Sequence, residues 1–121
     1  MIRSPEEVAL EALAAIRSGD FENLKPLLSE TIVYEDPRLV RRGVVAIKAL
    51  FEADRQAYSD MEWEISGLTC EGASVVVERV DRFTMNGERY SLDVVATFEV
   101  NEAGKLESFV QSFDSARPVQ S

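Results

Sequence analysis

The segment Val75–Phe83, which reads VVVERVDRF, constrains the fold of this chain more than any other segment. Its alternating pattern predicts a β-strand, because successive side chains of a strand point to opposite faces of the sheet. One face then carries valines and a phenylalanine together with Arg79 and Asp81. A charged pair among such neighbours is costly to bury unless the two charges satisfy each other. The strand therefore holds either a structural ion pair or the polar floor of a ligand cavity.

The size and charge of the chain limit its class and its partners. It has 121 residues, 45 % of them hydrophobic, which predicts one globular domain over residues 1–121. The net charge is −9 without a basic stripe, so we expect neither nucleic acid nor an anionic membrane as a partner. No stretch approaches the roughly 20 apolar residues of a membrane-spanning helix, and the acidic N-terminal segment does not resemble a signal peptide. We therefore expect a cytoplasmic protein.

The residue types that are present narrow the possible chemistry. The chain contains no histidine, which excludes Ser-His-Asp triads, Cys-His pairs and histidine metal sites. A general base must then be a carboxylate, a lysine or a tyrosine. Neither a Walker loop nor a GxGxxG motif is present, so we expect no cofactor and no metal. The single cysteine, Cys70, is interpreted as a small buried side chain in a reducing compartment.

The order of the predicted elements indicates the fold class. The pattern predicts helices after residues 4 and 20, a strand over 31–36, a helix from about 44 to 58, and strands over 61–66, 75–83, 90–100 and 105–114. Between residues 37 and 43 we expect a solvated loop that carries Arg38, Arg41 and Arg42. Helices grouped ahead of antiparallel strands predict an α+β fold, with helices packed on one face of a strongly curved sheet. Such a cone has a pocket at its mouth.

Five polar residues fall on the apolar faces of the predicted strands: Tyr34, Asp36, Arg79, Asp81 and Gln111. Buried polar groups need hydrogen-bond partners, so a cluster in one cavity is favoured over five separate polar groups without partners. Simpler interpretations stay open: an isolated ion pair for Arg79 and Asp81, an ordinary half-buried Tyr34, a Gln111 amide bonded to backbone, and an Asp-Pro turn at Asp36. The apolar residues expected to bind a substrate in this cavity are Ile32, Trp63, Val77, Phe83, Leu92, Val94, Phe98 and Phe109.

Several short motifs resemble one known superfamily. They are Ser-Gly-Asp-Phe between the first two helices, Val-Tyr-Glu-Asp followed by an Arg-Gly loop, and a terminal Ser-Phe-Asp. Together with the element order, they resemble the nuclear transport factor 2-like superfamily, which includes the SnoaL-like proteins, ketosteroid isomerases and limonene-1,2-epoxide hydrolases. The Glu-Arg-Val-Asp block, with Phe-Glu-Val, Gly-Lys and Phe-Asp further on, is most similar to the limonene-1,2-epoxide hydrolase branch. The resemblance implies the cone-shaped, cystatin-like fold and a homodimer.

The resemblance to the epoxide hydrolases also implies roles for individual residues. Arg79 resembles the arginine that bridges two aspartates, Asp81 the acid that protonates the epoxide oxygen, and Tyr34 the tyrosine that orients the attacking water. Asp36 stands where that family has asparagine, and Gln111 where it has the water-activating aspartate. We hypothesise that Asp36 is the base, that Tyr34 and Gln111 hold the water, and that Asp36 and Asp81 compete for Arg79 as a coupled pair. The substrate would be an apolar epoxide.

Two alternatives come from other classes of function. Ketosteroid isomerases carry their proton-shuttling aspartate in a setting similar to Glu35-Asp36-Pro37, which would make Asp36 the base of an isomerase. The positions of their oxyanion donors correspond to Ala12 and Ala96, so the largest stabilising contribution to enolate chemistry is missing. The other alternative is a non-catalytic protein that binds an apolar ligand, because one fold hosts many functions.

Overall fold

The computed structural model describes residues 3–119, so residues 1–2 and 120–121, the ends of the predicted domain, lie outside the described residues. The helices are α1 (Pro5–Ser18), α2 (Phe21–Leu24), the 3-10 helix η1 (Lys25–Leu27) and α3 (Val44–Ala57). Ser4 caps α1 by accepting a hydrogen bond from the backbone N–H of Glu7, and Asp20 caps α2, so the helices begin after residues 4 and 20 as predicted. None of the helices in residues 3–119 is long and apolar enough to cross a membrane.

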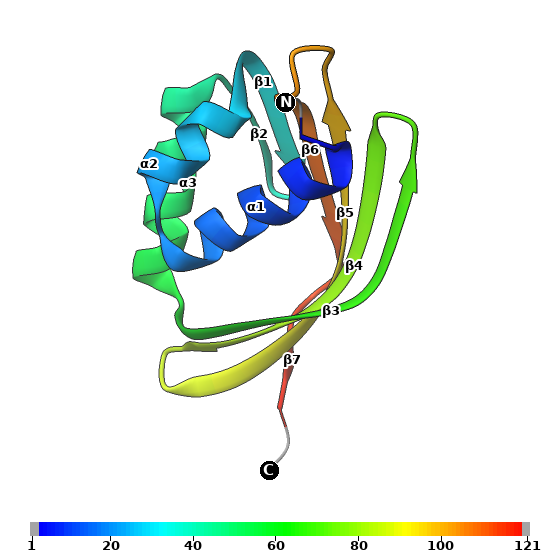
Figure 1. The fold of residues 1–121 in the computed structure, drawn as a ribbon. Coiled ribbons are helices and arrows are strands. Elements are labelled where there is room, and N and C mark those ends of the chain that lie inside the picture. The colour runs from blue at the N-terminus through cyan, green and yellow to red at the C-terminus, as the bar shows by residue number, and fades with distance from the viewer. Residues whose placement is uncertain (1–2, 120–121) are drawn as a thin grey trace.

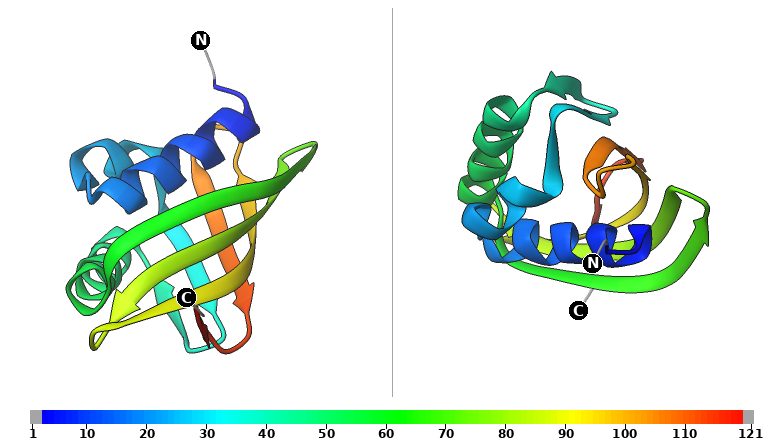
Figure 2. Two further views of the ribbon diagram at one scale, coloured as in Figure 1. Left: turned by 90° about the horizontal axis from the view of Figure 1, so that it is seen from below. Right: turned by 45° about the horizontal axis from the view of Figure 1, so that its top comes forward.

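The strands form one curled sheet around the helices (Figures 1 and 2). They are β1 (Leu28–Asp36), β2 (Leu39–Arg42), β3 (Ser59–Glu71), β4 (Ser74–Met85), β5 (Glu88–Val100), β6 (Leu106–Phe113) and β7 (Arg117–Pro118). The strand order is β2-β1-β6-β5-β4-β3, with β7 paired to β5. Only β1 and β6 pair in parallel; every other pair among the described residues is antiparallel. The predicted α+β cone with a mostly antiparallel sheet is therefore confirmed.

The turns and irregularities that shape the sheet follow from glycine positions. Asn86 and Gly87 both have positive φ, 52° and 80°, as a two-residue type I′ hairpin between β4 and β5 requires. The β3–β4 register shifts between Ile65 and Gly67, which marks a bulge or irregularity at that glycine. The three consecutive antiparallel strands β3, β4 and β5 thus bend over the helices instead of lying flat.

Two predictions about local structure are wrong. The segment that carries Arg41 and Arg42 is strand β2 and not a loop, because residues 39–42 pair with 33–36 of β1 across a tight turn. This strand is short, mostly exposed and at the edge of the sheet, so it has no apolar alternation to reveal it. Cys70 is exposed and not buried, because it lies on β3, the other edge strand.

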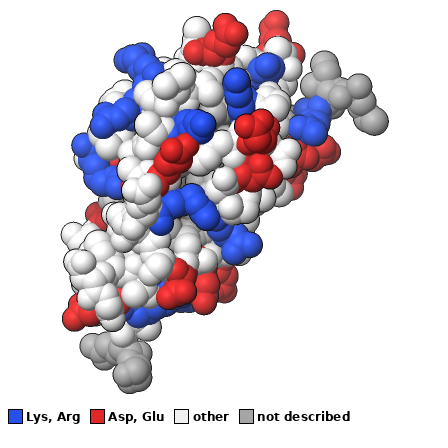
Figure 3. Space-filling view, turned by 90° about the vertical axis from the view of Figure 1, so that its left-hand side faces the viewer, with Lys and Arg blue, Asp and Glu red and all other residues white. Residues whose placement is uncertain are grey.

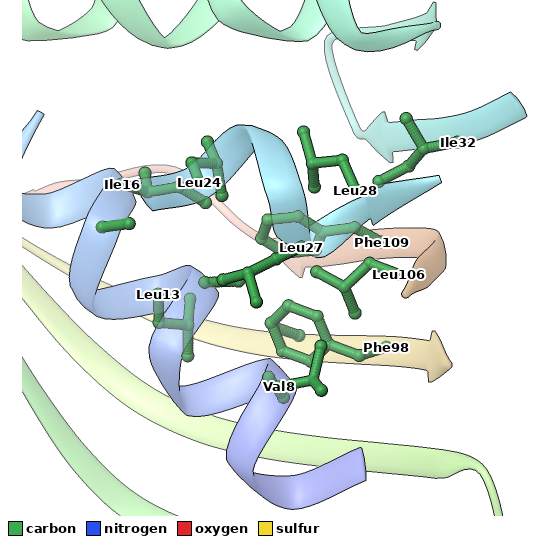
Figure 4. Packing of buried hydrophobic residues seen from close by; sticks show 14 of the residues in the cluster. Val8, Leu13, Ile16, Leu24, Leu27, Leu28, Ile32, Phe98, Leu106 and Phe109 are labelled. Atoms are coloured by element: carbon green, nitrogen blue, oxygen red, sulfur yellow. The ribbon is translucent and has the colours of Figure 1, made fainter. Parts of the chain in front are cut away.

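Buried hydrophobic residues of the helices pack against those of the sheet (Figure 4). Val8 and Leu13 of α1, with Leu27 of η1, pack against Phe98 of β5 and Leu106 of β6. The residues of β4 that face this core, Val75 and Val77, are fully buried. These side chains do not cover the other half of the concave face, and a cavity forms there.

Candidate active site

A cavity of about 720 Å³ lies at the open end of the cone. Its wall is drawn from β6, the C-terminal halves of α1, α3 and β4, the N-terminal halves of β3 and β5, and residues 114–116. Small-molecule sites commonly have volumes of about 300–1,000 Å³. The size of the cavity is therefore that of a binding site for one small organic molecule.

Most of the predicted apolar lining is in this wall, and the rest is in the core. Trp63, Phe83, Leu92, Val94 and Phe109 line the cavity. Three residues do not line it and lie in the hydrophobic core with no exposed surface: Ile32, Val77 and Phe98. They share a strand face with the lining residues but stand nearer the closed end, where α1 and η1 cover them, so periodicity alone could not separate the two sets.

The predicted pair of Arg79 and Asp81 lies at the cavity. Arg79 Nε donates to Asp81 Oδ1 at 2.7 Å and Nη2 to Oδ2 at 3.2 Å, and the guanidinium carbon stands 4.4 Å from the ring centre of Trp63. Both charged residues are buried, with exposed fractions of 3 % and 7 %. Burial raises the pKa of the Asp81 carboxyl, and the charge and hydrogen bonds of Arg79 only partly offset this. Asp81 is thus a carboxyl group that favours its protonated form more than a solvent-exposed aspartate does.

Gln111 connects this pair to the first strand. Its Oε1 accepts from Arg79 Nη2, and its Nε2 donates to the Tyr34 hydroxyl at 2.8 Å. Tyr34 in turn donates to Asp36 Oδ2 at 2.7 Å. The amide therefore bonds to side chains and not to backbone, and Tyr34 is fully buried instead of half-buried.

Aromatic neighbours hold Tyr34 in place. The rings of Phe51 and Phe109 stand edge-on to it, with centroids 5.3 Å and 5.1 Å away. Burial, and then the hydrogen bond to Asp36, raise the pKa of the Tyr34 hydroxyl. Tyr34 is therefore a neutral donor, behind the cavity wall that Phe51, Phe109 and Gln111 form.

Asp36 is held by Arg38 and not by Arg79. Its Oδ1 accepts from the backbone N–H of Arg38 at 2.8 Å, as in the predicted Asp-Pro turn, and its Oδ2 accepts from Arg38 Nη2 at 2.8 Å. Burial pushes the pKa of Asp36 upward, but the hydrogen bonds from Arg38 and Tyr34 outweigh it and leave the pKa below its usual range.

The hypothesis that Asp36 competes with Asp81 for Arg79 is therefore wrong. Among the described residues, the hydrogen-bond partners of the Arg79 side chain are Asp81 and Gln111. Asp36 is also not among the residues that line the cavity. The structure brings all five predicted polar residues into one network, but it places Asp36 behind the wall.

Two residues of this network escaped the sequence analysis. Arg38 reaches from the β1–β2 turn to Asp54 of α3, with Nη1–Oδ1 and Nη2–Oδ2 distances of 3.4 Å, and its guanidinium stands 5.9 Å from the ring centre of Phe113. Burial raises the pKa of Asp54, although Arg38 opposes this. Helical spacing could have found Asp54, because it follows the buried Ile47 and Phe51 at i+7 and i+3 on one helix face. Arg38 gave no such signal.

The network has further properties that bear on its chemistry. Two buried nitrogen donors, Arg79 Nη1 and Trp63 Nε1, have no hydrogen-bond partner among the described residues, so an oxygen atom of a ligand would suit them. Within residues 3–119, no group of three His, Cys, Asp or Glu side chains could hold a metal ion. Acidic and basic side chains are interspersed on the face that carries α2 and α3 (Figure 3).

Comparisons with known proteins agree with this architecture. No curated protein matches the chain. An LEH-like epoxide hydrolase from M. tuberculosis has 25 % sequence identity and a TM-score of 0.76, and the similarity covers 89 % of this chain and 80 % of that one.

Two other solved structures share the fold at lower identity. A proposed SnoaL-like polyketide cyclase from Shewanella denitrificans OS-217 has 16 % identity and a TM-score of 0.83, over 91 % of this chain and 90 % of that one. An NTF2-like protein from Burkholderia thailandensis E264 has 19 % identity and a TM-score of 0.82, over 93 % and 92 %. The family model of the SnoaL-like domain matches residues 9–109, and the chain therefore belongs to the SnoaL-like domain family.

Proposed function

We propose that this protein hydrolyses a small apolar epoxide, with Asp81 as the general acid. The observation that carries the proposal is a buried carboxyl group with a raised pKa, held by Arg79 in the wall of an apolar cavity. An acid for this reaction must hold its proton until the substrate oxygen arrives, and burial shifts the pKa of Asp81 in that direction.

The reaction would proceed by addition of water across one C–O bond of the epoxide. Asp81 donates its proton to the ring oxygen as that C–O bond breaks, and the oxygen of a water molecule forms a bond to the same carbon. The water loses one proton to a carboxylate base, and Asp81 regains a proton from solvent after the diol leaves. Acid and base catalysis of this kind each contribute about 10²–10⁴-fold to the rate.

The cavity wall supports an apolar substrate with one polar oxygen. Aromatic and aliphatic side chains dominate it, among them Trp63, Phe83, Leu92 and Phe109. Terpenoid, polyketide or steroid-like compounds have this character. The likeness to the LEH-like epoxide hydrolase supports the same reaction class.

The two alternatives have less support. An isomerase would use Asp36 as its base, but Arg38 and Tyr34 occupy the oxygens of that carboxylate, and it does not line the cavity. The positions of the missing oxyanion donors, Ala12 and Ala96, are buried in the core. A ligand-binding protein without activity would use the same cavity, and only turnover separates it from the hydrolase.

Incubation with a panel of apolar epoxides in oxygen-18-labelled water tests the proposal. We expect a diol that carries one labelled oxygen, and a decrease of about 10²–10⁴-fold in kcat/KM for Asp81→Asn. Glu78→Gln is the matched control, because Glu78 lies on the same strand but is exposed on the opposite face. Thermal shifts upon addition of epoxides without any diol would contradict hydrolysis and identify a binding protein.

A further inference from the structure

We propose that Asp54 on α3 is the base that takes the proton from the attacking water, and that it works opposite Asp81 at the other end of one hydrogen-bonded chain. This inference rests on the proposed hydrolysis. It assigns the carboxylate base, which that reaction needs in addition to the acid. Neither Gln111, whose amide is not basic, nor Asp36, which lies behind the wall, can fill the role.

A continuous series of contacts connects the two carboxylates. From Asp81 to Asp54 the chain passes through Arg79, Gln111, Tyr34, Asp36 and Arg38. Its middle members Tyr34 and Asp36 are buried behind the cavity wall, whereas both ends line the cavity. Asp81 and Asp54, at the two ends of this hydrogen-bond series, are thus the carboxylates of the series that a substrate can reach.

The hydrogen bonding of Asp54 leaves it free to act. Its described partners are the two Arg38 nitrogens at 3.4 Å, which are long contacts for charged groups. Asp36, by contrast, accepts shorter bonds from Arg38 and Tyr34 on both oxygens. Asp54 therefore keeps lone pairs for a water molecule, and Asp36 does not.

The carboxylates of this hydrogen-bonded network outnumber its guanidinium groups. The network contains three carboxylates and two guanidinium groups. When all five groups are ionised, the network has one net negative charge in a largely buried setting. One proton neutralises it. The side chain of Asp81 is 10 % exposed and that of Asp54 is 26 % exposed, so burial disfavours the ionised form more at Asp81 than at Asp54. In this scheme Asp81 carries the proton as the acid, and the more exposed Asp54 is the ionised base in the same cavity.

Other charged groups share the wall with Asp54 and define the controls. They are Arg17, Arg38, Arg55, Asp60, Arg79, Asp81 and Asp114. Asp60 and Asp114 are exposed carboxylates outside the chain of contacts. Burial raises the pKa of Asp54, which makes it a stronger base than an exposed aspartate.

The test compares pH profiles of kcat/KM for epoxide hydrolysis. We expect wild type to lose activity at low pH as the base is protonated, and Asp54→Asn to lose that low-pH limb and about 10²–10⁴-fold of rate. Glu52→Gln, exposed on the same helix and outside the cavity wall, should keep both rate and profile. Added formate should partly restore the rate of Asp54→Ala, because it can replace a missing base but not a missing structural contact.

The outcomes separate this inference from the proposed function. An active wild type with an unchanged Asp54→Asn profile would overturn the role of Asp54 and leave hydrolysis standing. If Asp60→Asn or Asp114→Asn loses the low-pH limb instead, the role of Asp54 is likewise overturned and hydrolysis still stands. A slow Asp54→Ala that keeps the limb and gains nothing from formate would show a structural role. A wild type that forms no labelled diol would overturn both proposals.

Discussion

At the scale of single residues, the site contains three aspartates whose surroundings differ. Burial raises the pKa of Asp81 and of Asp54, whereas hydrogen bonds from Arg38 and Tyr34 hold that of Asp36 low. Groups with pKa values pushed apart in one site are the usual basis of acid and base roles. The strand alternation predicted that Arg79 and Asp81 share a face with other polar residues. It could not predict which aspartate Arg38 would hold, because that depends on a turn.

Asp36→Asn should reduce the stability of the protein. The neutral amide weakens the hydrogen bonds from Arg38 and Tyr34 from the charged range of about 1.5–3 kcal/mol each to the neutral range of about 0.5–1.5 kcal/mol each. We therefore expect a decrease of roughly 2–3 kcal/mol in the free energy of unfolding at pH 7. Urea unfolding monitored by circular dichroism measures this. An unchanged midpoint would mean that the contacts of Asp36 contribute nothing to stability.

The stability that Asp36 provides should also depend on pH. Its pKa is lower in the folded protein than in the unfolded chain, so the contribution is complete above the ordinary aspartate pKa near 4 and is lost as the pH falls through the folded value. We expect the difference between wild type and Asp36→Asn to shrink in urea titrations between pH 5 and pH 2. A difference that is constant over this range would contradict the low pKa.

At the scale of elements, the site depends on how α3 and the β1–β2 hairpin meet. Arg38 in the turn joins Asp36 to Asp54, and Phe51 of the helix packs edge-on against Tyr34 of the strand. The Asn-Gly hairpin and the bulge at Gly67 could be predicted because local residue types determine them. Strands β2 and β7 could not, since short exposed strands form only through pairing with β1 and β5.

Phe51→Ala should destabilise the fold and loosen Tyr34. Phe51 is 5 % exposed, and removal of a buried phenylalanine costs about 3–5 kcal/mol. Val45→Ala, at an 84 % exposed position of the same helix, should change the free energy of unfolding by less than about 0.5 kcal/mol. Equal effects of the two substitutions in urea unfolding would show that the contact between α3 and β1 is not as described.

At the scale of the whole molecule, the cone places a packed core at one end and the cavity at the other. The opposite face of the sheet carries apolar side chains, since Val76 and Val80 are partly exposed and Val95 is 41 % exposed. These valines are interspersed with polar side chains, since Val95 pairs with Glu78 and Val80 with Asp93, and exposed apolar side chains on a sheet face can contribute to association. Strand alternation determines the outward direction of these valines, which lie opposite the cavity side of their strands.

We therefore propose that the protein forms a homodimer through this face. Light scattering coupled to size-exclusion chromatography should give twice the mass of the 13.5 kDa chain, and Val95→Glu should give the monomer with unchanged circular dichroism. A monomeric wild type at the micromolar concentrations of such an experiment would contradict the dimer.

The central claim is that Asp81 keeps a proton inside the cavity. Carbon-13 NMR titration of the aspartate carboxyl groups, assigned with Asp81→Asn, Asp54→Asn and Asp36→Asn, measures it most directly. We expect the pKa of Asp81 to lie above the ordinary aspartate range and that of Asp36 to lie below it. An Asp81 that is ionised at or below the pH of an exposed aspartate would contradict its assignment as the acid.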